Sequence, residues 1–305
     1  MKNEKHIPVM LNEVLDFLDL KNGDVVLDAT SGLGGHSVEI CKKIGKKGLF
    51  IGVEQDSEIL EENKLKKEIE SVGVLKCDCR VNFINDNFRN LDSFGIEYLD
   101  AAVFDLGMNT AQIMESGRGF SFQKDEPLIM NFKKEMGPED LTAMEILNTW
   151  SEEDIFEILK DYGEEGFAGP ISKSIIRQRK DRKMETTFDL VDAVRRGVPP
   201  FYTKRKIHFA TKTFQALRIA VNDELNALKE GMRKCWALLR DDGTMVVISF
   251  HSLEDRIVKN FFRDRKKEKT GIVLTKKPAI ASRGEVLENP KSRSAKLRAC
   301  KKVNL

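Results

Sequence analysis

Residues 24–36 read Asp-Val-Val-Leu-Asp-Ala-Thr-Ser-Gly-Leu-Gly-Gly-His, and they decide the fold. The apolar run 25–27 ends in Asp28, and residues 36–44 favour a helix. The segment between them carries three glycines: Gly32, Gly34 and Gly35. This order predicts a buried strand, a tight turn and a helix start. Because a Cβ would fill the space that a ligand needs, the glycines predict a close approach of backbone to ligand.

Two ligand classes use such a turn, the dinucleotides and S-adenosylmethionine. Residues 48–54 predict a second buried strand that ends in Glu54, placed to accept from both ribose hydroxyls of either ligand. The dinucleotide fingerprint needs a third small residue where this chain has Ser37. Asp28 would repel a pyrophosphate but could pair with the cationic end of a methionine moiety. S-adenosylmethionine is therefore favoured, and a glycine turn without a ligand stays an alternative.

The composition indicates a globular protein with a real core. The chain has 305 residues, 41% of them hydrophobic, without an apolar run of 18 residues or an apolar signal region, so we expect a cytoplasmic protein. Its five cysteines predict reduced thiols. Only Cys77 and Cys79 are close-spaced, and without a second Cys/His pair we expect no metal site there.

The charge is unevenly distributed along the chain. Residues 201–305 carry 25 Lys and Arg against 11 Asp and Glu, whereas residues 1–200 carry 26 against 38. A basic segment of this kind favours a polyanionic partner, although a solvated face at residues 259–277 is an equal alternative.

Further strands are predicted at 81–84 and 100–107, after a charged helix at 57–71. Phe88, in the loop after the third strand, could stack on adenine or fill the core. Asp105 ends the fourth strand. Since ligands bind outside the carboxyl ends of parallel strands, we expect Asp28, Glu54 and Asp105 to converge at one sheet edge.

The strand–helix alternation then stops. Residues 113–205 contain polar loops and breaks, and helices are predicted at 139–147, 152–161, 171–180 and 187–196. We therefore predict an inserted helical domain at 113–205, within a sheet domain formed by 1–112 and 206–305.

The sheet pattern returns at residues 243–250, after a long helix across 223–239. Ser249, His251 and Ser252 follow at the end of that strand, on the side where the ligand is expected. A histidine between two hydroxyls at this edge is a candidate for a functional role, and an ordinary structural role is as frequent.

Blocks along nearly the whole chain resemble the 16S ribosomal RNA cytosine N4-methyltransferases, the MraW or RsmH family. The blocks are His6–Leu11, Asp28–Thr30 with Gly34–Ser37, Phe104–Gly107, Arg118–Phe122, Tyr162–Glu165, Ala210–Leu225, Ile248–Lys259 and Asn289–Arg298. The resemblance implies a class I S-adenosylmethionine-dependent methyltransferase, an α/β fold with a Rossmann-like sheet and an inserted all-helical domain. Its implied substrate is a cytosine near the decoding site of the small ribosomal subunit, and it permits a homodimer.

The resemblance also implies residue roles. Gly34, Gly35 and His36 of the glycine loop would hold the cofactor. Glu54 would lie at its ribose and Phe88 near its adenine. Asp105 and Gln112 would lie beside the methionine and the reacting end. Asp105 would orient the amine, and Ser249 and His251 would hold the base or a phosphate.

The chemistry of the residues agrees with a nitrogen target. Methylation of cytosine at carbon 5 needs a covalent thiol, usually placed after a proline, and none of the eight prolines precedes a cysteine. The exocyclic amine is a poor nucleophile, so a nearby acceptor must localise its lone pair while the amine is held in line with the methyl group.

The chain departs from the family pattern at four places. It has Thr30-Ser-Gly where the family has Thr-Phe-Gly, and Glu54-Gln-Asp where the family has Asp-Arg-Asp. It also has Met108-Asn-Thr where the family has Val-Ser-Ser, and Ile129 and Asn131 where the family has Asp and Arg. These changes motivate an alternative, a non-catalytic ribosome-binding or assembly protein. A methyltransferase with a different RNA or protein target is a further alternative.

Overall fold

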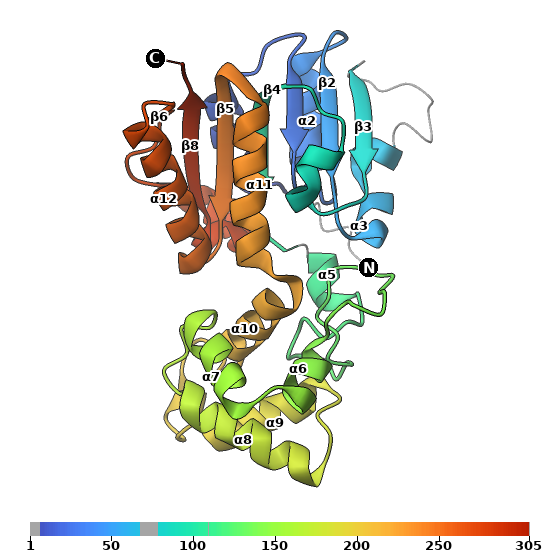
Figure 1. Cartoon of the computed structure of the whole chain (residues 1–305), viewed down its shortest axis with the longest axis vertical. Helices are drawn as coiled ribbons and strands as arrows, with labels where there is room; N and C mark the ends of the chain where they lie inside the picture. Colours follow the sequence, from blue (N-terminus) through green and yellow to red (C-terminus); the bar gives the residue numbers. More distant parts are fainter. Residues whose placement is uncertain (1–6, 68–78, 109, 305) are drawn as a thin grey trace. The chain divides into compact units, whose positions relative to one another are not determined.

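The computed structural model describes residues 7–67, 79–108 and 110–304, which form two compact units (Figure 1). The first, here called the sheet unit, comprises the chain up to Gly107 and again from Leu225. The second, the helical unit, comprises Met108–Glu224. The predicted division at 112/113 and 205/206 therefore differs from the observed units at both ends, most of all at the second.

The sheet unit contains a single mixed sheet in the order β3-β2-β1-β4-β5-β8-β6, and β7 also pairs with β8. The four pairings from β3 to β5 are parallel, and those of β8 are antiparallel. The strands are β1 (Val25–Asp28), β2 (Leu49–Val53), β3 (Arg80–Ile84), β4 (Leu99–Asp105), β5 (Leu239–Ser249), β6 (Gly271–Val273), β7 (Ala279–Ile280) and β8 (Lys296–Lys302). The sheet is a Rossmann-like α/β fold with an antiparallel strand added, and it confirms the predicted class.

The strand order creates a topological switch point between β1 and β4. From β1 the chain moves outward to β2 and β3, then returns to place β4 on the other side of β1. In open α/β sheets ligands bind outside the carboxyl ends of the strands at this point. Asp28 ends β1 and Asp105 ends β4, so these two carboxyl groups flank the switch point.

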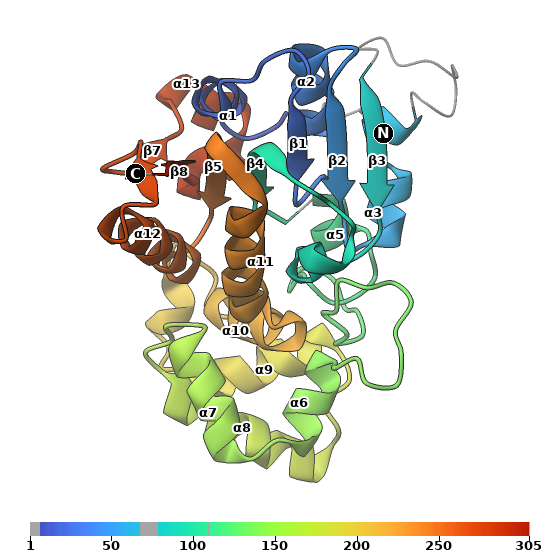
Figure 2. The ribbon, with the colours of Figure 1, turned by 45° about the horizontal axis from the view of Figure 1, so that its top comes forward.

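Apolar side chains cover both faces of the sheet. One face packs against α1 (Leu11–Leu18) and α2 (Gly35–Ile44), through residues such as Val14 and Ile40. The other packs against α11 (Glu224–Leu238) and α12 (Ser252–Lys267), through Met232 and Phe262. Figure 1 shows α11 crossing in front of the sheet, and Figure 2 brings α1 and α13 (Arg283–Glu288) into view. The remaining short helices are α3 (Ser57–Glu61), η1 (Phe88–Ser93) and η3 (Pro290–Ser294).

The helical unit has its own apolar core, built around Leu128, Ile171 and Leu217. Its helices are α5 (Thr110–Met114), α6 (Ala143–Thr149), α7 (Glu152–Asp161), α8 (Ala168–Asp181), α9 (Thr187–Gly197), η2 (Tyr202–Lys204) and α10 (Thr211–Asn222). α10 packs on α6 and α7, which is why residues 206–224 belong to this unit and not to the sheet unit as predicted. In the described part of the chain, no helix has the length and apolarity needed to span a membrane.

The predicted helix at 57–71 is interrupted. α3 ends at Glu61, and a second helical segment begins at Lys64 and is described to Lys67. The break lies at Asn63, whose Oδ1 accepts from the amides of Leu65 (3.0 Å) and Lys66 (3.3 Å) and so caps the second segment. The part of the prediction at 68–71 lies outside the described residues.

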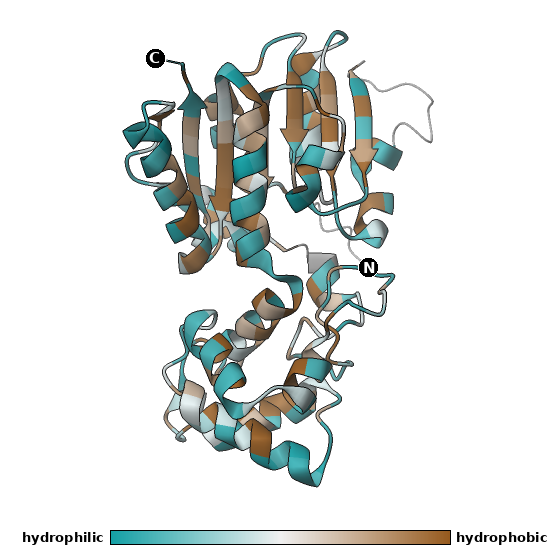
Figure 3. Ribbon diagram, in the orientation of Figure 1, coloured by the Kyte–Doolittle hydropathy of each residue, from teal (hydrophilic) through white to brown (hydrophobic). Residues whose placement is uncertain are grey.

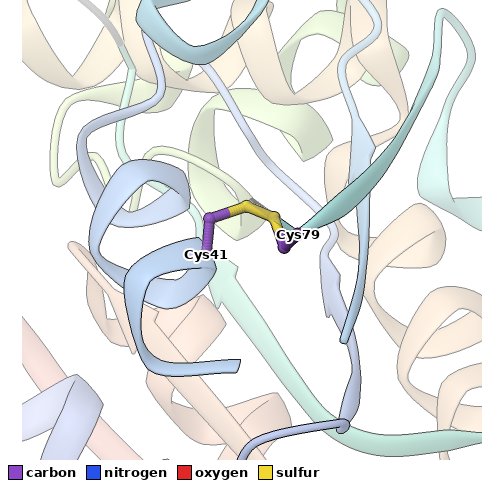
Figure 4. The surroundings of a disulfide bond; sticks show 2 residues. All are labelled: Cys41 and Cys79. Atoms are coloured by element: carbon purple, nitrogen blue, oxygen red, sulfur yellow. A yellow bond between two sulfur atoms is a disulfide. The ribbon is translucent and has the colours of Figure 1, made fainter. Parts of the chain in front are cut away.

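Two of the cysteines form a disulfide, contrary to the prediction of reduced thiols. Cys41 of α2 is joined to Cys79, which precedes β3, with a Cα–Cα distance of 5.7 Å (Figure 4). The partners are 38 residues apart, so their pairing left no short-range signal in the sequence. Cys235 and Cys300 are free and buried. Cys77 lies outside the described residues.

Candidate cofactor and methyl-transfer site

The site in the sheet unit is built on three carboxyl groups at the ends of three neighbouring strands. Asp28 ends β1, Asp105 ends β4, and Glu54 follows β2 directly. Asp28 is aligned with Gly52 of β2 and with Val103 of β4. Glu54 lies two residues after Gly52, and Asp105 lies two residues after Val103. The predicted convergence of the three acids at one sheet edge is therefore observed.

Burial dominates the electrostatics of these acids. It raises the pKa of Asp28 to about 6, that of Glu54 to about 7 and that of Asp105 to about 7. The charge of Asp105 adds to the increase in the pKa of Asp28, and the charge of Glu254 adds to the increase in the pKa of Asp105. Three acids that are difficult to ionise together favour a ligand with positive charge.

Glu54 fixes the glycine loop. Its Oε2 accepts from the amide of Gly32 at 3.0 Å and its Oε1 from the amide of Asp56 at 2.9 Å. A carboxylate offers about four lone-pair sites, so each oxygen retains one for a further donor such as a ribose hydroxyl. The predicted position of Glu54 beside the loop is observed, and its contact with a ribose stays a prediction.

The glycine loop has the backbone that its residues predict. Gly32 and Gly34 have φ values of +47° and +79°, in the region that side chains disfavour. A Cβ on Gly34 would lie 2.6 Å from Oδ1 of Asn63. α2 then begins at Gly35, directly after the loop.

Asn63 is a site residue that the sequence analysis missed. It is fully buried, and its Nδ2 donates to the carbonyl of Gly32 at 2.8 Å. Its Oδ1 caps the helical segment after it, as described above. Asn63 thus ties the loop to that segment. Its place within a predicted continuous helix concealed this role, although asparagine is a poor residue for a helix interior and a good cap.

Asp28 and Asp105 are also held by polar contacts. Asp28 accepts from the hydroxyl of Ser37 (3.0 Å) and the amide of Thr30 (3.2 Å). Thr30 in turn accepts from the amide of Asp105 through its hydroxyl oxygen, at 2.7 Å. Thr30 therefore connects the end of β4 to the glycine loop, and sequence reasoning did not single it out.

His36 lies in the first turn of α2, almost fully buried. Its Nε2 is 3.0 Å from the carbonyl oxygen of Val9, and its Nδ1 is 3.7 Å from Oδ2 of Asp105. A carbonyl only accepts, so Nε2 carries the proton. Burial lowers the pKa of His36, so the ring is neutral near pH 7 and its contact with Asp105 is not an ion pair.

The segment before α1 is also attached to this region. Met10, with φ +52°, donates its amide to Oε1 of Glu285 at 2.7 Å, and Asn289 donates to the carbonyl of Ile7 at 3.0 Å. The contact between His36 and Val9 brings the backbone of this segment next to the glycine loop.

Phe88 has a core contact. Its ring packs edge-on against Phe104 of β4 with a centroid distance of 5.5 Å, and a Cβ on Gly231 of α11 would lie 2.5 Å from it. Of the two predicted roles, core packing is therefore observed. Contact with an adenine stays a prediction.

Ser249 and His251 have structural partners. Ser249 is 1% exposed and donates to the carbonyl of Lys296 in β8 at 3.3 Å. His251 caps α12, with Nε2 3.0 Å from Oε1 of Glu254, and Glu254 accepts from the amides of Phe250 and His251. These contacts show a structural role for both residues. Their predicted role in holding the base or a phosphate stays a prediction.

The remaining predicted residues belong to the helical unit. Gln112 lies in α5 with its side chain buried, and its cofactor role stays a prediction. Asn131 donates to the carbonyl of Leu141 at 3.1 Å and accepts from the amide of Lys133 at 2.9 Å. Arg118 donates to the carbonyls of Asn131 and Phe132. The asparagine at 131 is thus part of a satisfied backbone-binding network within this unit.

Comparison with known proteins places the chain in a family. The sequence profile described as the MraW methylase family matches residues 3–303. A protein of Persephonella marina is 43% identical over 98% of this chain and 99% of its own length, and one of Sulfurihydrogenibium sp. is 44% identical with the same coverage. Both are named ribosomal RNA small subunit methyltransferase H.

Solved structures resemble the chain less closely. A putative rRNA methylase from Clostridium thermocellum has a TM-score of 0.47 and 14% identity, covering 97% of this chain and 99% of its own. A likeness of that size supports no conclusion about the site. The profile match and the full-length relatives are sufficient without it, and the chain belongs to the MraW methylase family.

Proposed function

We propose that this chain transfers the methyl group of S-adenosylmethionine to the exocyclic N4 amine of a cytosine in small-subunit ribosomal RNA, near the decoding site. Membership of the MraW methylase family and the name shared by the full-length relatives support the reaction and the substrate class. The position of the cytosine and the N4 atom follow from the resemblance of the sequence blocks. The observation that carries the proposal is the set of three acids with raised pKa values around the glycine loop at the switch point, of which Asp28 is fully buried and Glu54 and Asp105 are partly buried.

The acids suit the proposed cofactor. They accept hydrogen bonds from backbone amides and from the Ser37 hydroxyl. The charge of Lys291 also lowers the pKa of Asp105, but burial outweighs it. S-adenosylmethionine carries a sulfonium and an ammonium group. Positive charge near Asp28 and Asp105 favours their ionised forms and offsets the cost of burying them.

The cofactor, when bound, supplies an electrophilic methyl group on a positively charged sulfur. Glu54 would hold the ribose hydroxyls with the lone pairs that its amide partners leave available. Asp28 would face the cationic amino-acid end, and the loop of Gly32, Gly34 and Gly35 would approach the cofactor with its backbone.

Asp105 would act on the nucleophile. Its side chain is 21% exposed, so it is partly open to a base that has left the stack. An ionised Asp105 accepts an N–H of the cytosine amine, which localises the nitrogen lone pair and holds the amine in line with the methyl group. It would then take the proton that the amine loses as the N–C bond forms and the bond from the methyl carbon to sulfur breaks, with S-adenosylhomocysteine as the leaving group. With a pKa of about 7, the group can both accept and release that proton near neutral pH.

The described cysteines argue against a carbon target. Cys41 and Cys79 are in a disulfide, and Cys235 and Cys300 are buried. Burial raises the pKa of both Cys235 and Cys300, the latter to about 12, so neither forms a thiolate near pH 7. Covalent activation of cytosine carbon 5 needs such a thiolate. Methylation of a nitrogen atom needs no thiolate.

The proposal implies that the chain meets small ribosomal subunits in the cytoplasm. It is tested by incubating the protein with labelled S-adenosylmethionine and small subunits from cells that lack it. We expect RNA-bound label with the native protein and little with Asp105→Asn. Cofactor and subunit binding without any transfer would contradict the proposal and favour the non-catalytic ribosome-binding alternative.

A further inference from the structure

Helix α12 (Ser252–Lys267) has two chemically distinct faces. One is apolar and buried against the sheet unit, through Leu253, Val258 and Phe262. The other is exposed and basic. We call it the basic stripe, and it consists of Arg256, Lys259, Arg263, Lys266 and Lys267. Figure 3 shows hydrophilic and hydrophobic residues alternating along this helix.

The spacing aligns the stripe on one side of the helix. The first four members are three or four residues apart, and Lys267 lies four residues after Arg263, so each has a stripe neighbour one turn away. From Arg256 to Lys267 the stripe extends about 16 Å at about 1.5 Å per residue.

The acids of α12 neutralise the stripe only in part. Asp255 is occupied by Arg298 of β8, whose Nε is 2.6 Å from its Oδ1. Asp264 lies 3.5 Å from Nε of Arg263 and 3.8 Å from Nζ of Lys267, both on exposed side chains where such pairs contribute little. For the side chains of Lys259 and Lys266 the structure records no hydrogen bond or ion pair with any described residue.

The stripe begins at the sheet edge that carries the site. β5 pairs with β4, with Ile248 opposite Asp105, and α12 starts at Ser252, just after the end of β5. The basic stripe therefore starts close to the sheet edge where Asp28, Glu54 and Asp105 lie, and it continues along α12.

We infer that the basic stripe binds the phosphodiester backbone of the ribosomal RNA that flanks the target nucleotide, and so holds the RNA while the base reaches Asp105. This inference rests on the proposed function. A nucleic acid fits better than an anionic membrane, because a helix that binds membranes needs an exposed apolar face, and the apolar face of α12 is buried. Phosphate contacts of this kind supply affinity that depends on salt.

The test is a triple variant, Lys259→Gln, Arg263→Gln and Lys266→Gln, with a matched control. The control, Lys21→Gln, Lys43→Gln and Lys47→Gln, removes the same charge from exposed positions of the same unit, near the amino ends of β1 and β2. The dissociation constant for a small-subunit RNA fragment is measured over a range of salt concentrations, together with cofactor affinity and the methyl-transfer KM and kcat.

For the stripe variant we expect RNA affinity to fall about 10- to 100-fold near 0.1 M salt, and the slope of log K against log salt to decrease by about 2. KM for the RNA should rise, while kcat at saturation and cofactor affinity stay unchanged. The control should change RNA affinity less than about 2-fold.

The inference is overturned if the stripe variant keeps the native salt slope, or if the control weakens RNA binding equally. A loss of binding to vesicles of phosphatidylserine and phosphatidylcholine, with RNA affinity unchanged, would assign the stripe to a membrane instead. Absence of methyl transfer by the native protein would overturn the proposed function alone, since the binding measurement tests the stripe without catalysis.

Discussion

Nδ1 of His36 lies 3.7 Å from Oδ2 of Asp105, while Nε2 of the same ring donates to the carbonyl of Val9. The histidine thus joins the N-terminal segment to the acid at the end of β4. Since burial keeps the ring neutral, it places a lone pair, and not a positive charge, beside Asp105. The charge of Lys291 lowers the pKa of Asp105, but burial outweighs it, and a cationic ligand would stabilise the ionised Asp105 further.

Replacing Asp105 tests its role as orienting group and proton acceptor. Asp105→Asn and Asp105→Ala should lower kcat about 10²- to 10⁴-fold, the usual contribution of a positioned acid or base. Cofactor affinity and the unfolding midpoint are measured alongside, with Asp16→Asn on the exposed side of α1 as control. Native kcat in Asp105→Ala would remove this residue from the mechanism.

His36→Phe should weaken cofactor binding about 10-fold and lower the free energy of unfolding by about 1–3 kcal/mol, because the Val9 carbonyl loses its donor. His36→Gln can still donate to that carbonyl and should restore part of both. Calorimetric titration with cofactor and denaturant unfolding measure the two effects. If both variants lose cofactor affinity and stability equally, the hydrogen bond to the Val9 carbonyl is not the cause of these losses.

Asn63→Asp separates the two functions of Asn63. The aspartate keeps an acceptor for the amides of Leu65 and Lys66 but cannot donate to the Gly32 carbonyl. We expect weaker cofactor binding with the helix cap retained, and a loss of about 1–3 kcal/mol in the free energy of unfolding. Asn63→Ala loses both contacts and should be less stable still. Native cofactor affinity in both variants would contradict a role of Asn63 in shaping the loop.

Cofactor affinity should depend on pH with a defined sign. The pKa values of Asp28, Glu54 and Asp105 are raised, so without ligand their contribution to stability is full below about pH 4 and is lost as pH rises through about 6 to 7. A cationic ligand prefers the ionised forms, so affinity should increase roughly 10-fold or more between about pH 5.5 and about pH 8. Thermal-shift titration across this range, repeated with Asp105→Asn, should show a smaller increase for the variant. Affinity that falls with pH would mean that the acids do not face the ligand's positive charge.

The disulfide is tested by counting thiols. The unreduced, denatured chain should expose three of its five cysteines to alkylation, and all five after reduction. Closing a loop of 38 residues is expected to contribute about 3–4 kcal/mol to the free energy of unfolding. Five reactive thiols before reduction would restore the prediction made from the sequence.

Much of the sheet unit was predictable because its signals are local. The apolar runs at β1, β2 and β4, each followed by an acid, determine both the strands and the edge where the acids meet. The glycine turn is equally local, since only glycine adopts the φ values of residues 32 and 34 without cost.

Other features depend on tertiary contacts that no local pattern reveals. α10 and α11 are separated only by Asp223, with φ +47°, and the packing of α10 on α6 and α7 decides the boundary between the units. The roles of Asn63 and Thr30 require the loop to be placed beside them. The Ser249 hydroxyl has a strand-end position that indicates function, but its partner is a carbonyl of β8, the antiparallel neighbour.

The most direct test of the central claim is nucleoside mass spectrometry of small-subunit RNA. Subunits from cells without this protein are incubated with it and S-adenosylmethionine, and with Asp105→Ala in parallel. The account predicts N4-methylcytidine in the first sample and none in the second. A different methylated nucleoside, or N4-methylcytidine formed equally by both proteins, would contradict it.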